Sequence, residues 1–214
     1  MGGYMKIAVI NEVSAVLRNK DIIAALKDRG HEVFNAGMTN KEDKPELSYI
    51  HTGLLTAILL NTDKADLVIG SCGTGQGYLN SAMQYPGVFC GHILTPLDAW
   101  LFAQINGGNC ISLALNQGYG WAGEINLRYI FDRLFSAKFG GGYPPGRIEP
   151  QAKSRKILST ISQRTHYPFN EIISKIDDEI ILPVLKFPGV LELIDIDNIH
   201  DGKLKQALEE RAGL

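Results

Sequence analysis

Short runs of consecutive apolar residues alternate with longer amphipathic segments over the first two thirds of the chain. The runs predict strands at residues 6–10, 32–35, 66–70, 88–90 and 110–115. The segments between them predict helices at about residues 14–30, 48–61, 76–85, 96–106 and 121–135. Ser14 is the expected N-cap of the first helix, and Gly30 is the glycine expected to end it. The alternation predicts an α/β domain whose parallel sheet is buried on both faces and has right-handed crossovers.

The pattern changes after residue 139. Residues 139–146 are mostly glycine and proline and predict a loop. The chain beyond it predicts short helices, the last of which begins at Gly202, and the expected breaks fall at Pro168, Pro183 and Pro188. This segment is too apolar to remain unpacked. We therefore expect an α/β domain at residues 5–148 and a helical C-terminal extension at residues 149–214, which packs on the domain or on a partner subunit.

Composition and charge narrow the class of protein. The 214 residues are 45% hydrophobic and carry a formal net charge of −2, so we expect neither nucleic acid nor an anionic membrane as a partner. No apolar run approaches the roughly 18 residues of a membrane span, and residues 1–5 lack the features of a signal peptide. The three cysteines, Cys72, Cys90 and Cys110, have no disulfide or metal-site spacing. A cytoplasmic protein with free thiols is the expected reading.

The main candidate for chemistry is the glycine-rich loop Ser71-Cys-Gly-Thr-Gly-Gln-Gly77, which follows the third predicted strand. Ligands of open parallel sheets bind beyond the carboxyl ends of the strands. Backbone N–H groups of such a loop, and the helix predicted from Gln76, attract an anion and favour a thiolate. Cys72 can then act as a base that removes a proton next to a carbonyl. The amides of residues 73–77 would stabilise the resulting enediolate, and Thr74 would hold a substrate oxygen.

The same loop also fits phosphate binding without catalysis. Glycine-rich turns from strand to helix are common in α/β folds and often bind a phosphate. The loop lacks the Gly-Lys-Ser/Thr of a P-loop. It matches the dinucleotide fingerprint only in part and lies on the third strand, not the first. Spacing alone therefore leaves catalysis and simple anion binding open.

The loop, followed by Asn80-Ser-Ala82 and Pro86-Gly87, resembles the signature of the ribose-5-phosphate isomerase B family, which includes galactose-6-phosphate isomerase subunits. The resemblance implies a Rossmann-like αβα sandwich that forms a homodimer, or a dimer of dimers, with shared active sites. It also implies aldose–ketose isomerisation of a sugar or sugar phosphate through an enediolate, with no metal and no organic cofactor. The family's base matches Cys72 and its threonine matches Thr74. Its loop glycines match Gly73, Gly75 and Gly77.

Other positions depart from the family pattern. After the first strand the family usually has Asp-His, whereas this chain has Glu12-Val13 preceded by Asn11. The histidine that helps to open the sugar ring matches Ile105, while the asparagine after it is kept as Asn106. His92 follows the fourth strand on the ligand side, where it either takes over part of that role or is a solvated or packed residue. We expect Asn11, Glu12 and Asn106 to contact the substrate.

The family's two phosphate-binding arginines reach the site across the dimer. The first matches Tyr143 here, and the second matches Arg147, which we expect to bind substrate. These changes argue against a plain ribose-5-phosphate isomerase. The alternatives are a phosphate held by one arginine and by backbone amides, a substrate that is already open-chain, or a sugar that is unphosphorylated or differently charged. The alternative is a non-catalytic sugar- or phosphate-binding paralogue, as part of a hetero-oligomer. His51, on the second helix, is either structural or near the pocket.

Overall fold

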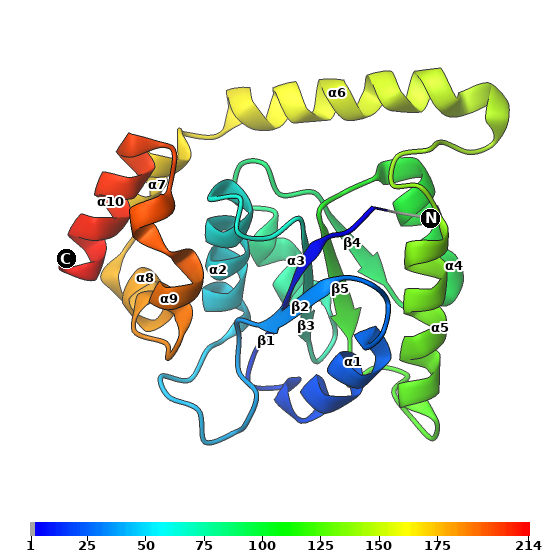
Figure 1. Ribbon diagram of the computed structural model, residues 1–214, viewed down its shortest axis with the longest axis horizontal. Helices are drawn as coiled ribbons and strands as arrows, with labels where there is room; N and C mark the ends of the chain where they lie inside the picture. The colour runs from blue at the N-terminus through cyan, green and yellow to red at the C-terminus, as the bar shows by residue number, and fades with distance from the viewer. Residues whose placement is uncertain (1–2) are drawn as a thin grey trace.

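The computed structural model describes residues 3–214, and its centre is a sheet of five parallel strands (Figure 1). The strands are Lys6–Asn11 (β1), Glu32–Asn35 (β2), Leu67–Cys72 (β3), Cys90–Ile93 (β4) and Cys110–Ala114 (β5). They lie in the order β2-β1-β3-β5-β4. β3 and β5 are buried throughout, which explains their successive apolar residues. The predicted five-stranded parallel sheet is confirmed.

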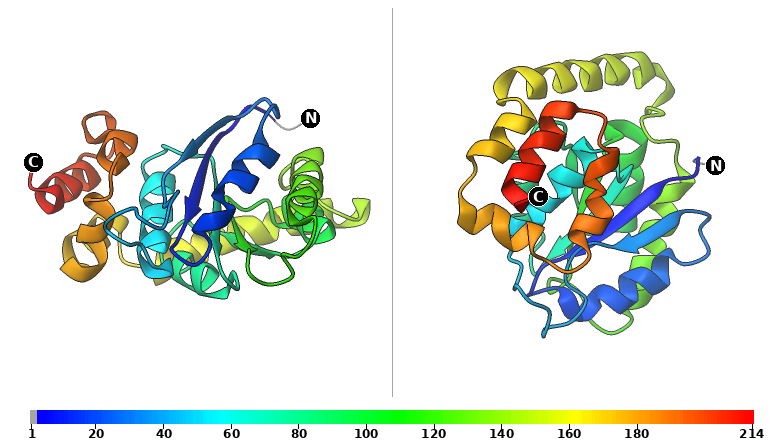
Figure 2. Two further views of the ribbon diagram at one scale, coloured as in Figure 1. Left: turned by 90° about the horizontal axis from the view of Figure 1, so that it is seen from below. Right: turned by 60° about the vertical axis from the view of Figure 1, so that its left-hand side comes forward.

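Helices cover both faces of this sheet and complete a three-layer sandwich (Figure 2). The helices are Asn19–Leu26 (α1), Tyr49–Asn61 (α2), Gln76–Ala82 (α3), Pro96–Leu101 (α4) and Gly123–Ser136 (α5). α1, α4 and α5 pack on one face, and α2 and α3 pack on the other. α4 continues into a π-helical turn, Phe102–Asn106. The arrangement confirms the Rossmann-like αβα architecture.

The C-terminal extension is helical, as predicted. Its helices are Ile148–Thr165 (α6), Phe169–Lys175 (α7), Asp178–Leu185 (α8), Val190–Ile194 (α9) and Gly202–Ala212 (α10). α6 runs along one side of the molecule and leads to a cluster of α7 to α10 beside α2 (Figure 1). This cluster and α2 share one hydrophobic core. The extension therefore packs on the α/β domain of its own chain.

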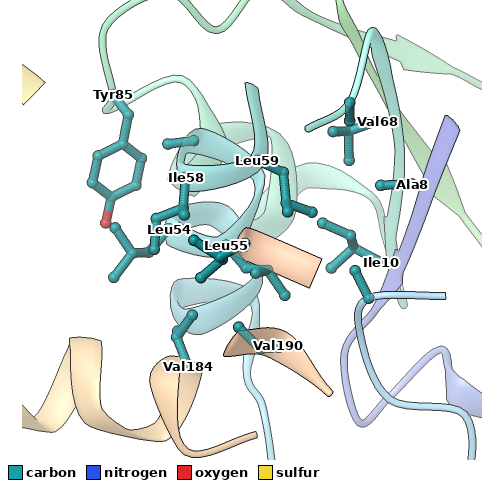
Figure 3. Close-up of a cluster of buried hydrophobic side chains, with 14 of the residues drawn as sticks. Ala8, Ile10, Leu54, Leu55, Ile58, Leu59, Val68, Tyr85, Val184 and Val190 are labelled. Atoms are coloured by element: carbon teal, nitrogen blue, oxygen red, sulfur yellow. The ribbon is translucent and has the colours of Figure 1, made fainter. Parts of the chain in front are cut away.

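α2 is buried between the sheet and the extension. Residues 52–59 of this helix are all buried, which matches a helix that is apolar on every side. Figure 3 shows Leu55 and Leu59 of α2 gathered with Ile10 of β1 and with Val184 and Val190 of the extension. α2 thus packs against the sheet on one side and against the extension on the other.

Removal of one side chain from this core should destabilise the whole chain. Leu55 is 0% exposed, so Leu55→Ala leaves a cavity and should lower the free energy of unfolding by about 2–5 kcal/mol. Urea unfolding followed by circular dichroism measures this loss. Leu97→Ala is the matched control, because Leu97 is 63% exposed and its loss should stay within about 0.5 kcal/mol. Equal losses in the two variants would contradict the placement of α2.

Several boundaries differ from those expected. β4 begins at Cys90, two residues later than the run at 88–90 indicated. Ser14 does not cap α1: a short 3₁₀ turn, Val16–Arg18, precedes the helix, and the Ser14 hydroxyl binds elsewhere. α1 also ends at Leu26, before Gly30. The expected cap was wrong because the tertiary structure supplies Ser14 with other partners.

The sequence predicted a helix break at Pro183. The structure contradicts this, because Pro183 lies inside α8. Proline has no N–H, so the carbonyl of Glu179, four residues earlier, loses its helical donor. His51 Nε2 lies 3.2 Å from that carbonyl oxygen and donates to it, while His51 Nδ1 accepts from the backbone N–H of Ser48 at 3.0 Å. His51 therefore joins the start of α2 to the extension, and its role is structural.

None of the residues of α6 is buried. Arg155 attaches it to the domain through hydrogen bonds to the carbonyl oxygens of Ile105 (2.8 Å) and Gly140 (2.7 Å). Its apolar side chains nevertheless face solvent, with exposed fractions near one half for Ile157, Leu158 and Ile161. Within residues 3–214, no helix combines the length and the apolar character that crossing a membrane requires.

Candidate active site

The carboxyl ends of three neighbouring strands form the floor of the candidate site. β1, β3 and β5 are adjacent, so Asn11 pairs in register with Ser71, and Cys72 pairs with Ala114. Cys72 is the last residue of β3, is 5% exposed, and carries a free thiol. The glycine-rich loop follows it and leads into α3. The predicted catalytic cysteine thus lies at the edge where open parallel sheets bind ligands.

Two glycines of the loop allow a close approach to neighbouring side chains. Gly75 is the N-cap of α3 and has a φ of +73°, a conformation that favours glycine. A Cβ on Gly75 would lie 2.5 Å from Nε2 of His92. A Cβ on Gly77 would lie 3.0 Å from Cγ of Tyr49, so the tyrosine ring packs against the loop backbone. Glycine at these two positions therefore lets His92 and Tyr49 pack directly against the loop backbone.

Side chains from β4 and β5 hold the carbonyl groups of the loop. His92 donates from Nε2 to the carbonyl oxygen of Thr74 at 3.1 Å, so its Nδ1 accepts from the side-chain amide of Gln76 at 3.4 Å. The Ser112 hydroxyl donates to the carbonyl oxygen of Gly75 at 2.6 Å. Both nitrogens of the His92 ring are thus engaged by the loop. His92 supports the loop and leaves no ring nitrogen for a substrate in this arrangement.

The backbone N–H groups of the loop are not equivalent. The N–H of Gly73 donates to Ser14 Oγ at 2.8 Å, and the N–H of Gln76 donates to Thr74 Oγ1 at 3.3 Å. In the part of the chain that the structure describes, the loop amides without an acceptor include those of Thr74, Gly75 and Gly77. The sequence predicted an anion site from all amides of residues 73–77. The Gly73 amide has a protein partner instead, because Ser14 approaches it from the end of β1.

Asn11 and Glu12, two of the predicted substrate-binding residues, are buried and form hydrogen bonds with other residues of the protein. Asn11 is 0% exposed, donates to Asn19 Oδ1 at 2.7 Å and accepts from Ser71 Oγ at 2.5 Å. Glu12 is 4% exposed, and both of its carboxylate oxygens accept hydrogen bonds from Ser14. Asn11 thus bonds Ser71, the residue before Cys72, and Glu12 bonds Ser14, which in turn binds the N–H of Gly73.

Asn106 and Arg147, the other two predicted substrate-binding residues, lie away from Cys72. Asn106 ends the π-helical turn before β5, and the five residues of β5 separate the two ends of the sheet by about 13 Å. Arg147 is exposed in a 3₁₀ turn, Pro145–Arg147, that leads into α6. α6 contacts the π-helical turn that precedes β5 through Arg155 and Ile105, and Figure 1 shows it on the side of the molecule where β1 begins. One chain alone does not bring these residues to the thiol.

Comparison with known proteins identifies the family. The family model described as Ribose/Galactose Isomerase matches residues 7–149. A solved 4-deoxy-L-threo-5-hexosulose-uronate ketol-isomerase, complexed with a tartrate, is 41% identical over 98% of this chain and 100% of its own, with a TM-score of 0.91. The ribose-5-phosphate isomerase LacAB_rpiB of Vibrio parahaemolyticus is 38% identical with the same coverages and a TM-score of 0.92.

A further solved structure shares the fold. The ribose-5-phosphate isomerase B of Clostridium thermocellum is similar in fold, with 24% identity, coverage of 76% of this chain and 100% of its own, and a TM-score of 0.64. The two longer relatives each cover 98% of this chain, so they share its C-terminal extension. The family match and the two longer relatives establish a sugar isomerase that interconverts aldoses and ketoses, and the chain belongs to the ribose/galactose isomerase family.

Proposed function

We propose that the chain isomerises an open-chain sugar acid of the class of 4-deoxy-L-threo-5-hexosulose uronate, with Cys72 as the base. The observation that supports this best is Ile105, an apolar residue at the position that matches the family's ring-opening histidine. The ketol-isomerase that is 41% identical over its full length acts, by its name, on this uronate. An open-chain substrate makes a ring-opening group unnecessary.

The chemistry of the uronate explains why no ring has to be opened. Its name places an aldehyde at carbon 1, a ketone at carbon 5 and a carboxylate at carbon 6, and removes the hydroxyl from carbon 4. A five- or six-membered hemiacetal at carbon 1 needs a hydroxyl on carbon 4 or carbon 5. Neither is present, so the aldehyde that reacts cannot be closed into such a ring. Ribose 5-phosphate does close a ring and has to be opened before it isomerises.

The reaction is a proton transfer between neighbouring carbons. The thiolate of Cys72 removes the proton from carbon 2, and the electron pair moves onto the carbonyl oxygen of carbon 1 to form the enediolate. The N–H groups of Thr74, Gly75 and Gly77 are the loop donors for the developing charge, assisted by the N-terminus of α3. The Thr74 hydroxyl holds a substrate oxygen. Cys72 returns the proton to carbon 1 while the hydroxyl proton of carbon 2 passes to the other oxygen, which leaves a ketone at carbon 2.

Shared active sites in a dimer would bring the remaining residues to the substrate. Arg147 has no acceptor for its guanidinium among residues 3–214, so it is available to bind an anionic group of the substrate. The exposed apolar side chains of α6, including Ile157 and Leu158, are a surface that a second copy can cover. We propose that Asn106 and Arg147 complete the site of the partner subunit.

The proposal predicts a substrate preference. The purified enzyme should isomerise 4-deoxy-L-threo-5-hexosulose uronate with a kcat/KM at least about tenfold above that for ribose 5-phosphate. Ribose 5-phosphate has to be ring-opened first, and the protein has no histidine at the position that matches the family's ring-opening group. Proton NMR of both reactions in parallel measures the two values. A higher kcat/KM for ribose 5-phosphate would favour the activity named for the Vibrio relative. Sugar binding without any turnover would favour the non-catalytic paralogue.

A further inference from the structure

We propose that Glu12, Ser14 and Asn116 form a clamp that positions Cys72 and the anion-binding loop for catalysis. The clamp joins the ends of β1 and β5 to Gly73, the loop residue that directly follows Cys72 in the chain. Its residues are positioning residues and act through the backbone of Gly73. The effect on turnover rests on the proposed function, whereas the effect on the loop itself does not.

Ser14 holds the nitrogen side of Gly73. Its Oγ accepts the N–H of Gly73 at 2.8 Å and donates its own proton to Glu12 Oε1. The backbone N–H of Ser14 donates to Glu12 Oε2 at 3.1 Å. A hydroxyl both donates and accepts, whereas an ionised carboxylate only accepts. Glu12 therefore sets the direction of the Ser14 hydroxyl, whose lone pair is left for Gly73.

Asn116 holds the oxygen side of the same residue. Its backbone N–H donates to the carbonyl oxygen of Gly73 at 2.9 Å, and its side-chain Nδ2 donates to the carbonyl oxygen of Ser14 at 3.0 Å. The three residues Ser14, Gly73 and Asn116 thus form a closed ring of hydrogen bonds across three strand ends. A Cβ on Gly73 would lie 3.1 Å from both Ser14 Oγ and Asn116 Nδ2, so the ring encloses this glycine closely.

The ring determines which groups of the loop remain for a ligand. The carbonyl of Cys72 is also bound, by the N–H of Leu115 at 3.2 Å, so the backbone on both sides of the Cys72–Gly73 peptide is fixed. With the N–H of Gly73 directed to Ser14, the donors left for an anion begin at Thr74. The structure also changes the role expected for Glu12. Its carboxylate is 4% exposed and engaged by Ser14, so it orients the loop and does not itself contact the substrate.

Hydrogen exchange and kinetics of two variants test the clamp. Ser14→Ala removes the acceptor of the Gly73 N–H, so we expect amide exchange at Gly73 in the free protein to accelerate about tenfold or more. We also expect kcat to fall about tenfold, the factor typical of one lost hydrogen bond, with KM unchanged within about twofold. Ser14→Thr keeps the hydroxyl and should restore both quantities to within about threefold of the wild type.

The controls separate the clamp from general damage and from the proposed substrate. Ser174→Ala, which removes a local hydrogen bond to Asn170 on the exposed face of α7, should change neither Gly73 exchange nor kcat. NMR measures exchange without any sugar, and kinetics are measured with whichever of the uronate and ribose 5-phosphate the wild type turns over. If it turns over neither, the proposed function fails and exchange alone decides on the clamp. Unchanged Gly73 exchange in Ser14→Ala, an effect on KM alone, or no rescue by Ser14→Thr would overturn the clamp.

Discussion

Replacement of Cys72 by alanine should abolish isomerisation, with a fall in kcat of about 10³-fold or more, because the variant has no base to remove the proton from carbon 2. The side chain is small and lies at the end of β3, so the sheet should keep its structure. Turnover in ²H₂O measures the chemistry directly, since proton transfer through the thiol introduces solvent deuterium into the product. Both turnover and deuterium incorporation should disappear together.

Cys90→Ala provides the matched control for this experiment. Burial raises the pKa of the Cys90 thiol well above its ordinary value, which keeps this group protonated and unsuited to act as a base. The control should therefore turn over substrate within about threefold of the wild-type rate. If Cys72→Ala retained more than about a tenth of the wild-type kcat, another group would have to be the base.

The sequence predicted the strand, the turn and the helix that carry the candidate site, because their signals are local along the chain. Consecutive apolar residues before Ser71, and glycines after it, indicate a buried strand and an anion-binding turn without knowledge of the fold. Ser14 and Asn116 had no such signal, because their hydrogen bonds exist only once β1, β3 and β5 lie side by side. A serine after a strand is equally typical of a helix cap, which is why the sequence favoured the wrong role.

The packing of the extension shows the same limit. Its apolar residues predicted that the extension is packed, but they did not distinguish the α/β domain from a partner subunit as the surface that it covers. The signal that could have indicated the surface lies elsewhere in the chain, in α2, which is apolar on all sides and therefore needs cover beyond the sheet. The partnership of His51 with the carbonyl of Glu179 depends on Pro183 inside α8, a placement against the usual preference of proline.

Arg147 is the residue through which the proposed dimer can be tested most sharply. It lies beyond the end of the sheet opposite Cys72, and the turn that carries it leads into the exposed helix α6. If Arg147 binds the anionic end of the substrate in the partner's site, each site contains one Cys72 and one Arg147 from different chains. Arg147→Ala should then lower kcat/KM by about 10–100-fold, the range expected for lost charge-assisted hydrogen bonds.

Co-expression of Cys72→Ala chains with Arg147→Ala chains should raise kcat/KM above that of either variant alone. In a mixed dimer one site carries both substitutions and the other carries none, so random assembly leaves roughly a quarter of all sites intact. The kcat/KM of the unfractionated mixture, relative to the wild type, measures this fraction, and two different affinity tags confirm that mixed dimers have formed. Cys72→Ala mixed with Cys72→Ser is the matched control, because both chains lack the same group and no intact site can form. Mixed dimers of Cys72→Ala and Arg147→Ala without restored activity would show that Arg147 does not act across the dimer, and the shared-site proposal would then fail.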